Sequence, residues 1–169
     1  MALKTAQEYI ESAGKLTPRV FVGGKWVENL LDNAITLSVV RATAKIYELA
    51  EKEEYKEIMV GTSHLTGGPV NRNLNIARNT HDLDMRQEMA LLTSQHLGTC
   101  NYRCVGCDAL NALAASTWEM DRDLGTDYNK RFNAYLAWAQ ENDLACSGAI
   151  TDAKGDRKKR PSQQADPDM

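Results

Sequence analysis

The sequence has no long hydrophobic run, and this lack excludes several classes of protein at the outset. No stretch approaches the roughly 20 apolar residues that a helix needs to span a bilayer. Residues 1–15 are polar and lack the apolar core of a secretory signal peptide. Charge of one sign is not in large excess, and the net charge of -3 gives no reason to expect nucleic acid or an anionic membrane as partner. We therefore expect a cytoplasmic protein.

A phosphate-binding loop and internal repeats are also missing. Residues 61–69 are rich in glycine and other turn-forming residues, but they lack the lysine of a P-loop, and no strand clearly precedes them. We interpret this segment as a loop and not as a nucleotide site.

Cysteine is scarce, but its distribution is uneven. Cys100, Cys104 and Cys107 fall within eight residues, whereas Cys146 stands alone. In a cytosolic chain such crowding favours a metal or redox site over a disulfide framework.

Helical periodicity is what the sequence has in abundance. The chain of 169 residues is long enough for one domain with a real core, and 43% hydrophobic and 25% charged residues are typical of a soluble globular protein. Thr5 and Glu8 have the spacing of a capping box. Helices are expected over residues 5–15, from Asn33 or Thr36 through Ala50, over residues 82–97, from just after the cysteines to about residue 125, and from Thr126 or Asp127 through Ala139.

Apolar stripes on these helices predict a helical bundle, with one small β-hairpin near residues 20–27 around Gly23-Gly24. We expect the stripes to form the core and not to contact a cofactor, and the fold class to be mainly α. The stripes are Val39, Thr43, Ile46 and Ala50; Met85, Met89 and Leu92; Leu110, Leu113, Ala114 and Trp118; and Phe132, Tyr135, Leu136 and Ala139.

The cysteine cluster is the best candidate for chemistry. Thiolates are the usual ligands of iron–sulfur clusters, and one loop can present several of them to one cluster. A loop between two helices can also direct backbone N–H groups at cluster sulfurs, which stabilises their negative charge.

The CxxxCxxC spacing of Cys100, Cys104 and Cys107 is also the spacing of radical S-adenosylmethionine enzymes. In that superfamily the motif follows the first strand of a parallel α/β barrel. Here it follows a long helix, later strands are scarce, and such a barrel normally needs about 200 residues or more. The context therefore argues against this alternative.

Short motifs along the whole chain carry a more specific resemblance. They are residues 6–12, 65–67, 71–72, 98–100, 103–106, 125–128, 130–132, 140–144, 151–152, 154–157, 161–162 and 164–168. In this order, and with little gapping, they resemble the 4-hydroxybutyryl-CoA dehydratase family. The wider superfamily includes flavin-dependent 4-hydroxyphenylacetate 3-monooxygenases. Those have arginine and tyrosine in place of Cys100 and Cys104, so the two cysteines indicate the dehydratase branch.

This resemblance implies a fold like that of acyl-CoA dehydrogenases, with a helical N-terminal domain, a β-domain and a helical C-terminal domain. FAD lies between them beside a [4Fe-4S] cluster. The family converts 4-hydroxybutyryl-CoA to crotonyl-CoA and isomerises vinylacetyl-CoA. One-electron oxidation by the flavin makes an unactivated β C–H bond acidic, and a cluster iron can act as Lewis acid on the leaving hydroxyl.

The resemblance also implies roles for single residues. Cys100 and Cys104 are expected to ligate the cluster, and the family's other two ligands, a histidine and a cysteine, have no counterpart in this sequence. Cys107 is interpreted as a packed thiol with a third ligand as the alternative, and Cys146 as structural. Tyr102 replaces a glutamine near the substrate, and the three histidines match no family ligand.

The basic C-terminal segment gains a role by the same match. We expect it to contact FAD, with Arg157 suited to the pyrophosphate or the reduced isoalloxazine and with a solvated, disordered tail as the alternative. The expected flavin contacts are Lys154, Gly155, Asp156, Arg157, Arg160, Pro161, Ser162 and Gln163.

The resemblance divides the chain into a helical N-terminal domain, residues 1–146, and a flavin-contacting loop, residues 147–169, that leads to a β-domain the sequence does not contain. We expect the chain to act as part of a complete lyase and isomerase and to be inactive alone. The complete enzyme is expected to bind an acyl-CoA substrate and to form the family's tetramer. The expected partner of this chain is the missing C-terminal half or a separate chain. The alternative is a non-catalytic assembly domain, or a split subunit of a flavin-dependent 4-hydroxyphenylacetate 3-hydroxylase-type protein.

Overall fold

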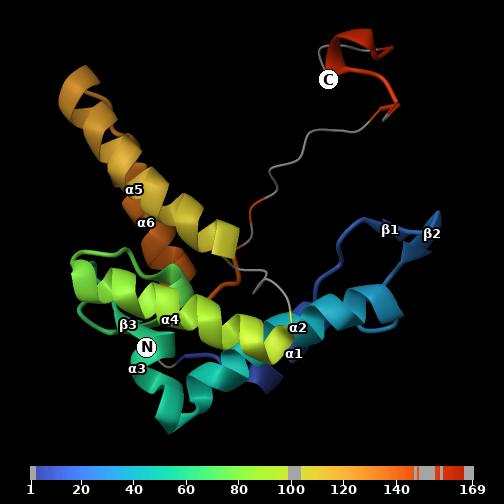
Figure 1. Cartoon of the computed structure of the whole chain (residues 1–169), viewed down its shortest axis with the longest axis horizontal. Helices are drawn as coiled ribbons and strands as arrows, with labels where there is room; N and C mark the ends of the chain where they lie inside the picture. The colour runs from blue at the N-terminus through green and yellow to red at the C-terminus, as the bar shows by residue number, and fades with distance from the viewer. Residues whose placement is uncertain (1–2, 99–103, 147, 149–154, 157, 166–169) are drawn as a thin grey trace.

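The computed structural model describes residues 3–98, 104–146, 148, 155–156 and 158–165, which form a mainly helical protein (Figure 1). This confirms the fold class predicted from the sequence. None of the described helices is both long and apolar enough to cross a membrane. The α-helices are α1 (Ala6–Gly14), α2 (Ala34–Glu51), α3 (Lys56–Met59), α4 (Thr80–Leu97), α5 (Cys104–Leu124) and α6 (Tyr128–Glu141), and the 3-10 turns are η1 (Glu53–Tyr55), η2 (Arg72–Leu74) and η3 (Pro161–Gln163).

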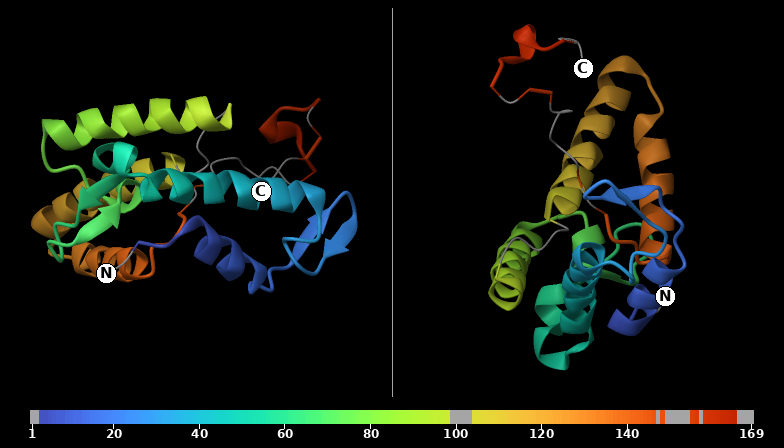
Figure 2. Two further views of the ribbon diagram at one scale, coloured as in Figure 1. Left: turned by 90° about the horizontal axis from the view of Figure 1, so that it is seen from below. Right: turned by 90° about the vertical axis from the view of Figure 1, so that its right-hand side faces the viewer.

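The helices form a layer with a protruding hairpin. Helix α2 lies between α1 and α4, as the left view of Figure 2 shows. Helices α5 and α6 pack against each other and extend away from that layer (Figures 1 and 2). The short η2 turn contacts the base of this hairpin. The start of α5 therefore lies at a junction between the layer and the hairpin.

The predicted β-hairpin near residues 20–27 is confirmed. Strand β1 (Val20–Val22) pairs antiparallel with β2 (Lys25–Val27), with Phe21 opposite Trp26. The two rings meet edge to face at 4.8 Å between centroids, a favourable arrangement for an aromatic pair.

A second hairpin contradicts the expectation for residues 61–69. Strand β3 (Val60–Thr62) pairs antiparallel with β4 (Pro69–Asn71), so a strand does feed the glycine-bearing loop. The loop closes on Ser63, whose N–H donates to Gly68 O and whose hydroxyl donates to Gln140 Oε1. A strand of three residues is too short for alternation to reveal, which explains why the sequence pattern missed it.

The helix starts follow the predicted capping chemistry, with one exception. Thr5 and Glu8 form the capping box, and Asn33 caps α2. Neither Thr126 nor Asp127 caps α6 through its side chain. Instead, the Asp121 carboxylate at the end of α5 accepts from the backbone N–H groups of Tyr128 and Asn129 at 2.8 and 2.9 Å. The cap therefore comes from the preceding helix.

The first hydrophobic core lies between α2, α3 and α4. The predicted stripe on α2 is correct for Thr43, Ile46 and Ala50, but Val39 is exposed and its neighbour Val40 is buried instead. The core cluster consists of Ile46, Leu49, Ala50, Met59, Met89 and Leu92.

The second core joins the base of the α5–α6 hairpin to η2. It consists of Leu74, Ile76, Leu110, Phe132, Leu136 and Ala139. The prediction that Leu113, Trp118 and Tyr135 belong to the core is wrong, since Leu113 and Trp118 are 47% and 55% exposed and Tyr135 is also exposed. Periodicity identified the helices, but a protruding hairpin buries apolar residues only near its base.

Candidate functional site

The first turn of α5 carries part of the cysteine cluster. Cys104 is the first residue of α5, but Cys100 and the Cys104 side chain lie outside the described part of the structure. Cys107 ends this turn, is 2% exposed, and has its Sγ 4.0 Å from the Arg72 carbonyl oxygen. Its thiol therefore faces the protein interior, in agreement with its interpretation as a packed residue.

Asn111 ties the start of α5 to the segment after η2. Its amide nitrogen donates to Cys107 O at 3.0 Å and to Asn75 O at 3.3 Å. Its amide oxygen accepts from the Ala77 N–H at 2.9 Å. On the outer side, the Arg86 guanidinium pairs with Asp108 and so links α4 to α5. These contacts fix the first two turns of α5 on two sides.

Arg72 supports this junction from within. The side chain is 3% exposed and donates to three backbone carbonyls at the end of α3, those of Glu57, Ile58 and Val60, at 2.7–2.8 Å. Burial lowers the pKa of Arg72, and the Asp82 carboxylate 3.6 Å away opposes that shift. A guanidinium remains charged under such a shift, so it can hold these carbonyls permanently. The sequence indicated Arg72 only as part of the motif at residues 71–72, not as a support for these carbonyls.

Cys146 lies close to the first turn of α5, residues 104–107, which we call the cysteine turn, although it is far away in sequence. A Cβ added at Gly106 would lie 2.2 Å from Cys146 O and 3.1 Å from Cys146 Cβ, so the two backbones are in direct contact. The Cys146 thiol is 3.6 Å from the Tyr135 hydroxyl, and this hydrogen bond, with burial, raises the pKa of Tyr135. The sequence offered one signal for this approach, the glycine between Cys104 and Cys107.

The start of α5 suits a negatively charged group electrostatically. The first N–H groups of a helix have no partner within the helix, and the helix dipole adds positive potential there. A thiolate at a helix start is stabilised by the helix dipole. Among the residues the structure describes, no three His, Cys, Asp or Glu side chains gather as a metal site.

The basic segment has its own local structure. Lys154 and Arg157 lie outside the described residues. In the described part, the Gln164 side chain accepts from Asp156 N at 2.8 Å and donates to Asp156 O and Lys159 O at 2.8 and 3.1 Å. A Cβ at Gly155 would lie 2.2 Å from Gln164 Oε1.

That turn leaves its basic and polar side chains on the outside. The exposed side chains are Asp156, Lys158, Lys159, Arg160, Ser162 and Gln163. Pro161 begins η3. In Figure 1 this segment lies away from the helices. The predicted flavin contacts that the structure describes are therefore not brought together with the start of α5.

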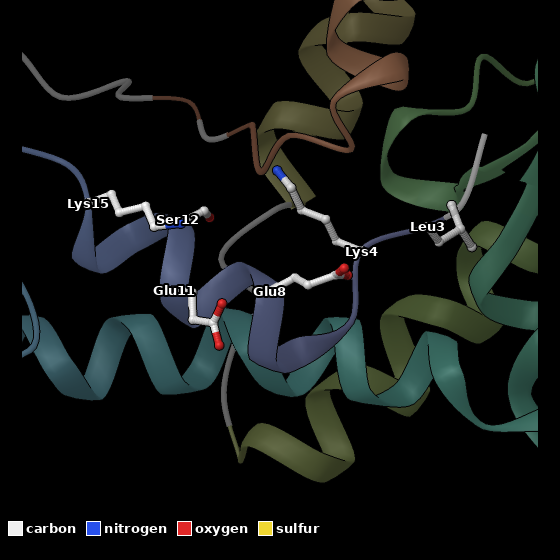
Figure 3. Close-up of a pocket in the computed structure, with 6 residues that line it drawn as sticks. All are labelled: Leu3, Lys4, Glu8, Glu11, Ser12 and Lys15. Carbon is white, nitrogen blue, oxygen red and sulfur yellow. The ribbon is translucent and has the colours of Figure 1, made fainter.

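A groove of about 320 Å³ lies elsewhere, along α1 (Figure 3). Its lining carries two lysines and two glutamates and includes none of the predicted site residues. These lining residues are Leu3, Lys4, Glu8, Glu11, Ser12 and Lys15. The hydroxyl of Ser12 donates to Tyr9 O at 2.7 Å, and the lining includes no histidine or cysteine, so we do not consider this groove the functional site.

The structure is thus that of a helical domain with two features that favour negatively charged groups. One is the start of α5, which carries cysteines, and the other is the basic segment near the C-terminus. The chain belongs to the family described as 4-hydroxyphenylacetate 3-hydroxylase N terminal, whose model matches residues 5–169.

Two branches of relatives are similar to this chain. It is 43% identical over 99% of its length to 4-hydroxybutyryl-CoA dehydratase/vinylacetyl-CoA-Δ-isomerase of Clostridium aminobutyricum, and covers 34% of that protein. It is 27% identical over 97% of its length to the oxygenase component of 4-hydroxyphenylacetate 3-monooxygenase of Thermus thermophilus, and covers 33% of that protein.

Solved structures give the same two branches. An oxygen-tolerant archaeal 4-hydroxybutyryl-CoA dehydratase from N. maritimus matches 99% of this chain and 33% of its own, with a TM-score of 0.86 and 40% identity. A monooxygenase oxygenase component complexed with FAD and 4-hydroxyphenylacetate matches 97% of this chain and 33% of its own, with a TM-score of 0.73 and 25% identity. The chain thus spans about a third of the length of these relatives.

Proposed function

We propose that this chain supplies the helical N-terminal part of a FAD- and [4Fe-4S]-dependent dehydratase that converts 4-hydroxybutyryl-CoA to crotonyl-CoA and isomerises vinylacetyl-CoA. The observation that carries the proposal is the 43% identity to such an enzyme over 99% of the chain. The 27% identity to the oxygenase branch is lower over a similar length. The chain acts with the polypeptide that forms the other two thirds of its relatives, and is inactive alone.

Cys100 and Cys104 are the proposed cluster ligands from this chain. Two thiolates four residues apart in sequence, the second at the first position of α5, are a suitable donor set, and the positive end of the helix dipole adds stabilisation of negative charge. We leave Cys107 out of the proposed set, since its thiol is buried with its Sγ 4.0 Å from the Arg72 carbonyl oxygen. The remaining two ligands come from the rest of the enzyme.

The basic segment is the proposed flavin contact, as the loop that joins the helical domain, residues 1–146, to the next domain. Exposed lysine and arginine side chains can bind a pyrophosphate, and hydroxyl and amide groups can hydrogen-bond a flavin ring. Lys158 and Lys159 extend the set predicted from the sequence. The Gln164 contacts order the backbone before any ligand is present, which reduces the entropy lost on binding.

The chemistry needs groups that the chain itself does not contain. When bound, FAD supplies one-electron oxidation and a cluster iron supplies Lewis acidity toward a hydroxyl group. The chain's own part is to hold thiolates in one orientation through the fixed start of α5 and to bind the anionic part of the cofactor. The acyl-CoA substrate and a tetrameric assembly belong to the same proposal.

Co-expression with the missing part of a dehydratase relative tests this proposal. The complex should contain flavin and iron and should dehydrate 4-hydroxybutyryl-CoA. Cys100→Ala and Cys104→Ala should abolish the activity and lower the iron content, because losing one thiolate leaves an iron without its protein ligand. Iron, acid-labile sulfide and dehydratase rate are the measurements.

Cys107→Ala is the matched control, and it should leave both iron and activity largely intact. If it loses the cluster as fully as the other two variants, a three-cysteine site replaces the proposed one. If the unmodified complex binds flavin but no iron, and instead hydroxylates 4-hydroxyphenylacetate, the chain belongs functionally to the oxygenase branch.

A further inference from the structure

At Gly106 in α5, another part of the backbone comes too close for a side chain. The contact is with the carbonyl group of Cys146, whose oxygen lies 2.2 Å and whose carbon lies 2.5 Å from the site of a Cβ. Gly106 itself is buried. Alanine usually stabilises the interior of a helix relative to glycine, so a glycine here points to a packing requirement.

The helix side of this contact is firmly held. Cys107 is buried against Arg72, Asn111 is bonded to Asn75 and Ala77, and Asp108 pairs with Arg86. These three neighbours of Gly106 connect to η2, to the segment after it and to α4. Moving the first turn of α5 would break all of them at once.

The other side of the contact is irregular backbone, residues 144–146. After α6, the Asp143 carbonyl accepts from the Tyr47 hydroxyl at 2.7 Å, and the Asp143 carboxylate accepts from Lys4 N at 3.0 Å. Beyond that anchor, Leu144 and Cys146 pack on the second core, but the described residues there have no helix or strand. In sequence this stretch leads directly to the basic segment.

We propose that Gly106 is a positioning residue that seats residues 144–146 on the cysteine turn and thereby sets where the flavin-binding segment departs from the helical domain. The inference rests on the proposed function for the identity of the two cofactor sites. Because α5 is tied to η2, to the segment after it and to α4, a side chain at position 106 displaces the segment and leaves the helix in place. Flavin binding is therefore affected and cluster binding is not.

The first test uses the chain alone and does not depend on any cofactor. Gly106→Ala should raise the rate of Cys146 alkylation by N-ethylmaleimide several-fold, read by peptide mass spectrometry, while Cys107 stays protected. Gly14→Ala is the matched control: it is also a helical glycine, but its Cβ meets only the Leu31 side-chain end at 2.8 Å, which can rotate away. Unchanged Cys146 reactivity in Gly106→Ala overturns the proposal.

The second test uses the co-expressed complex. Gly106→Ala should weaken FAD binding roughly tenfold, as for other changes that displace the support of a cofactor site, and should keep the iron content. Loss of iron and flavin in equal proportion means that α5 itself has moved, and the proposal is wrong. A wild-type complex without flavin or iron instead contradicts the proposed function, while the alkylation result still stands.

Leu144→Ala keeps the inference testable if Gly106→Ala does not fold. This change loosens the same segment from the second core and alters no residue in the first turn of α5. It should likewise raise Cys146 reactivity and weaken FAD binding with iron retained. If Cys146 reactivity rises but FAD affinity is unchanged, the segment does not set the departure of the flavin loop.

Discussion

Single residues in this protein act mainly by holding backbone. Arg72 holds three carbonyls at the end of α3, and Asn111 holds the start of α5 to Asn75 and Ala77. Buried polar groups of this kind are costly unless they are bonded, so each bond also specifies where its partner lies. The result is a cysteine-bearing turn whose orientation is fixed before any cofactor binds.

Core side chains provide the stability on which that orientation depends. Leu136→Ala should destabilise the chain by about 2–5 kcal/mol, because Leu136 is fully buried in the second core and the change leaves a cavity there. Urea denaturation followed by circular dichroism measures the free energy of unfolding.

Leu124→Ala is the matched control for this change. Leu124 is 68% exposed near the tip of the same hairpin, so its loss should change the free energy of unfolding by about 0.5 kcal/mol or less. If the two variants lose stability equally, the assignment of the second core to the base of the hairpin is wrong.

Among the elements, the α5–α6 connection shows a cap supplied from outside the helix it serves. The Asp121 carboxylate accepts from the Thr126 hydroxyl and from two N–H groups of α6. The Thr126 hydrogen bond is the largest cause of a lowered Asp121 pKa, and the bonds from Asn129 and Tyr128 act in the same direction. The charged carboxylate is thus part of the folded state.

The pH dependence of stability follows from that lowered pKa. A carboxyl whose pKa is lower in the folded state contributes stability that is present above its unfolded value, about 3.9, and is lost as pH falls through the folded value. Asp121→Asn should therefore lower the melting temperature at pH 7. The difference from the unmodified chain should shrink steadily below pH about 4.

Thermal melts followed by circular dichroism from pH 7 to pH 3 measure this effect. Asp123→Asn is the control for losing an exposed carboxylate whose pKa is also lowered, by its hydrogen bond with Arg122. It should change the melting temperature less than Asp121→Asn at pH 7, because that pair is exposed to solvent. A constant difference between Asp121→Asn and the unmodified chain at all pH values contradicts the role of the charge.

The elements could largely be predicted from sequence, but their packing could not. Capping residues and 3.6-residue periodicity located the long helices, because both signals are local. The exposure of Leu113 and Trp118 depends on where the hairpin leaves the body, which no local pattern encodes. The approach of Cys146 to Gly106 joins residues 40 positions apart, and only the folded chain reveals it.

At the scale of the whole molecule, the chain and its relatives differ most in extent. The chain covers about a third of the length of the dehydratase and oxygenase relatives, yet it aligns over nearly all of its own length. Exposed apolar side chains along α5 and α6 are the expected consequence if more polypeptide packs there in a complete enzyme. The proposed cofactor sites are correspondingly shared between this region and the rest.

A shared site predicts how this chain behaves when iron and sulfide are supplied to it alone. Anaerobic reconstitution should not give a stable [4Fe-4S] cluster, because the proposed site takes only Cys100 and Cys104 from this chain. Metal affinity depends on the number of thiolate and imidazole ligands that the fold holds together, and two ligands leave two irons without a protein bond. Iron and sulfide analysis after desalting, with the visible absorption spectrum, measures the outcome.

Adding the complementary part of a dehydratase relative before reconstitution should restore cluster formation, and Cys104→Ala should prevent that restoration. A stoichiometric cluster in the chain alone, with S-adenosylmethionine bound, would contradict the two-ligand proposal and favour the three-cysteine alternative.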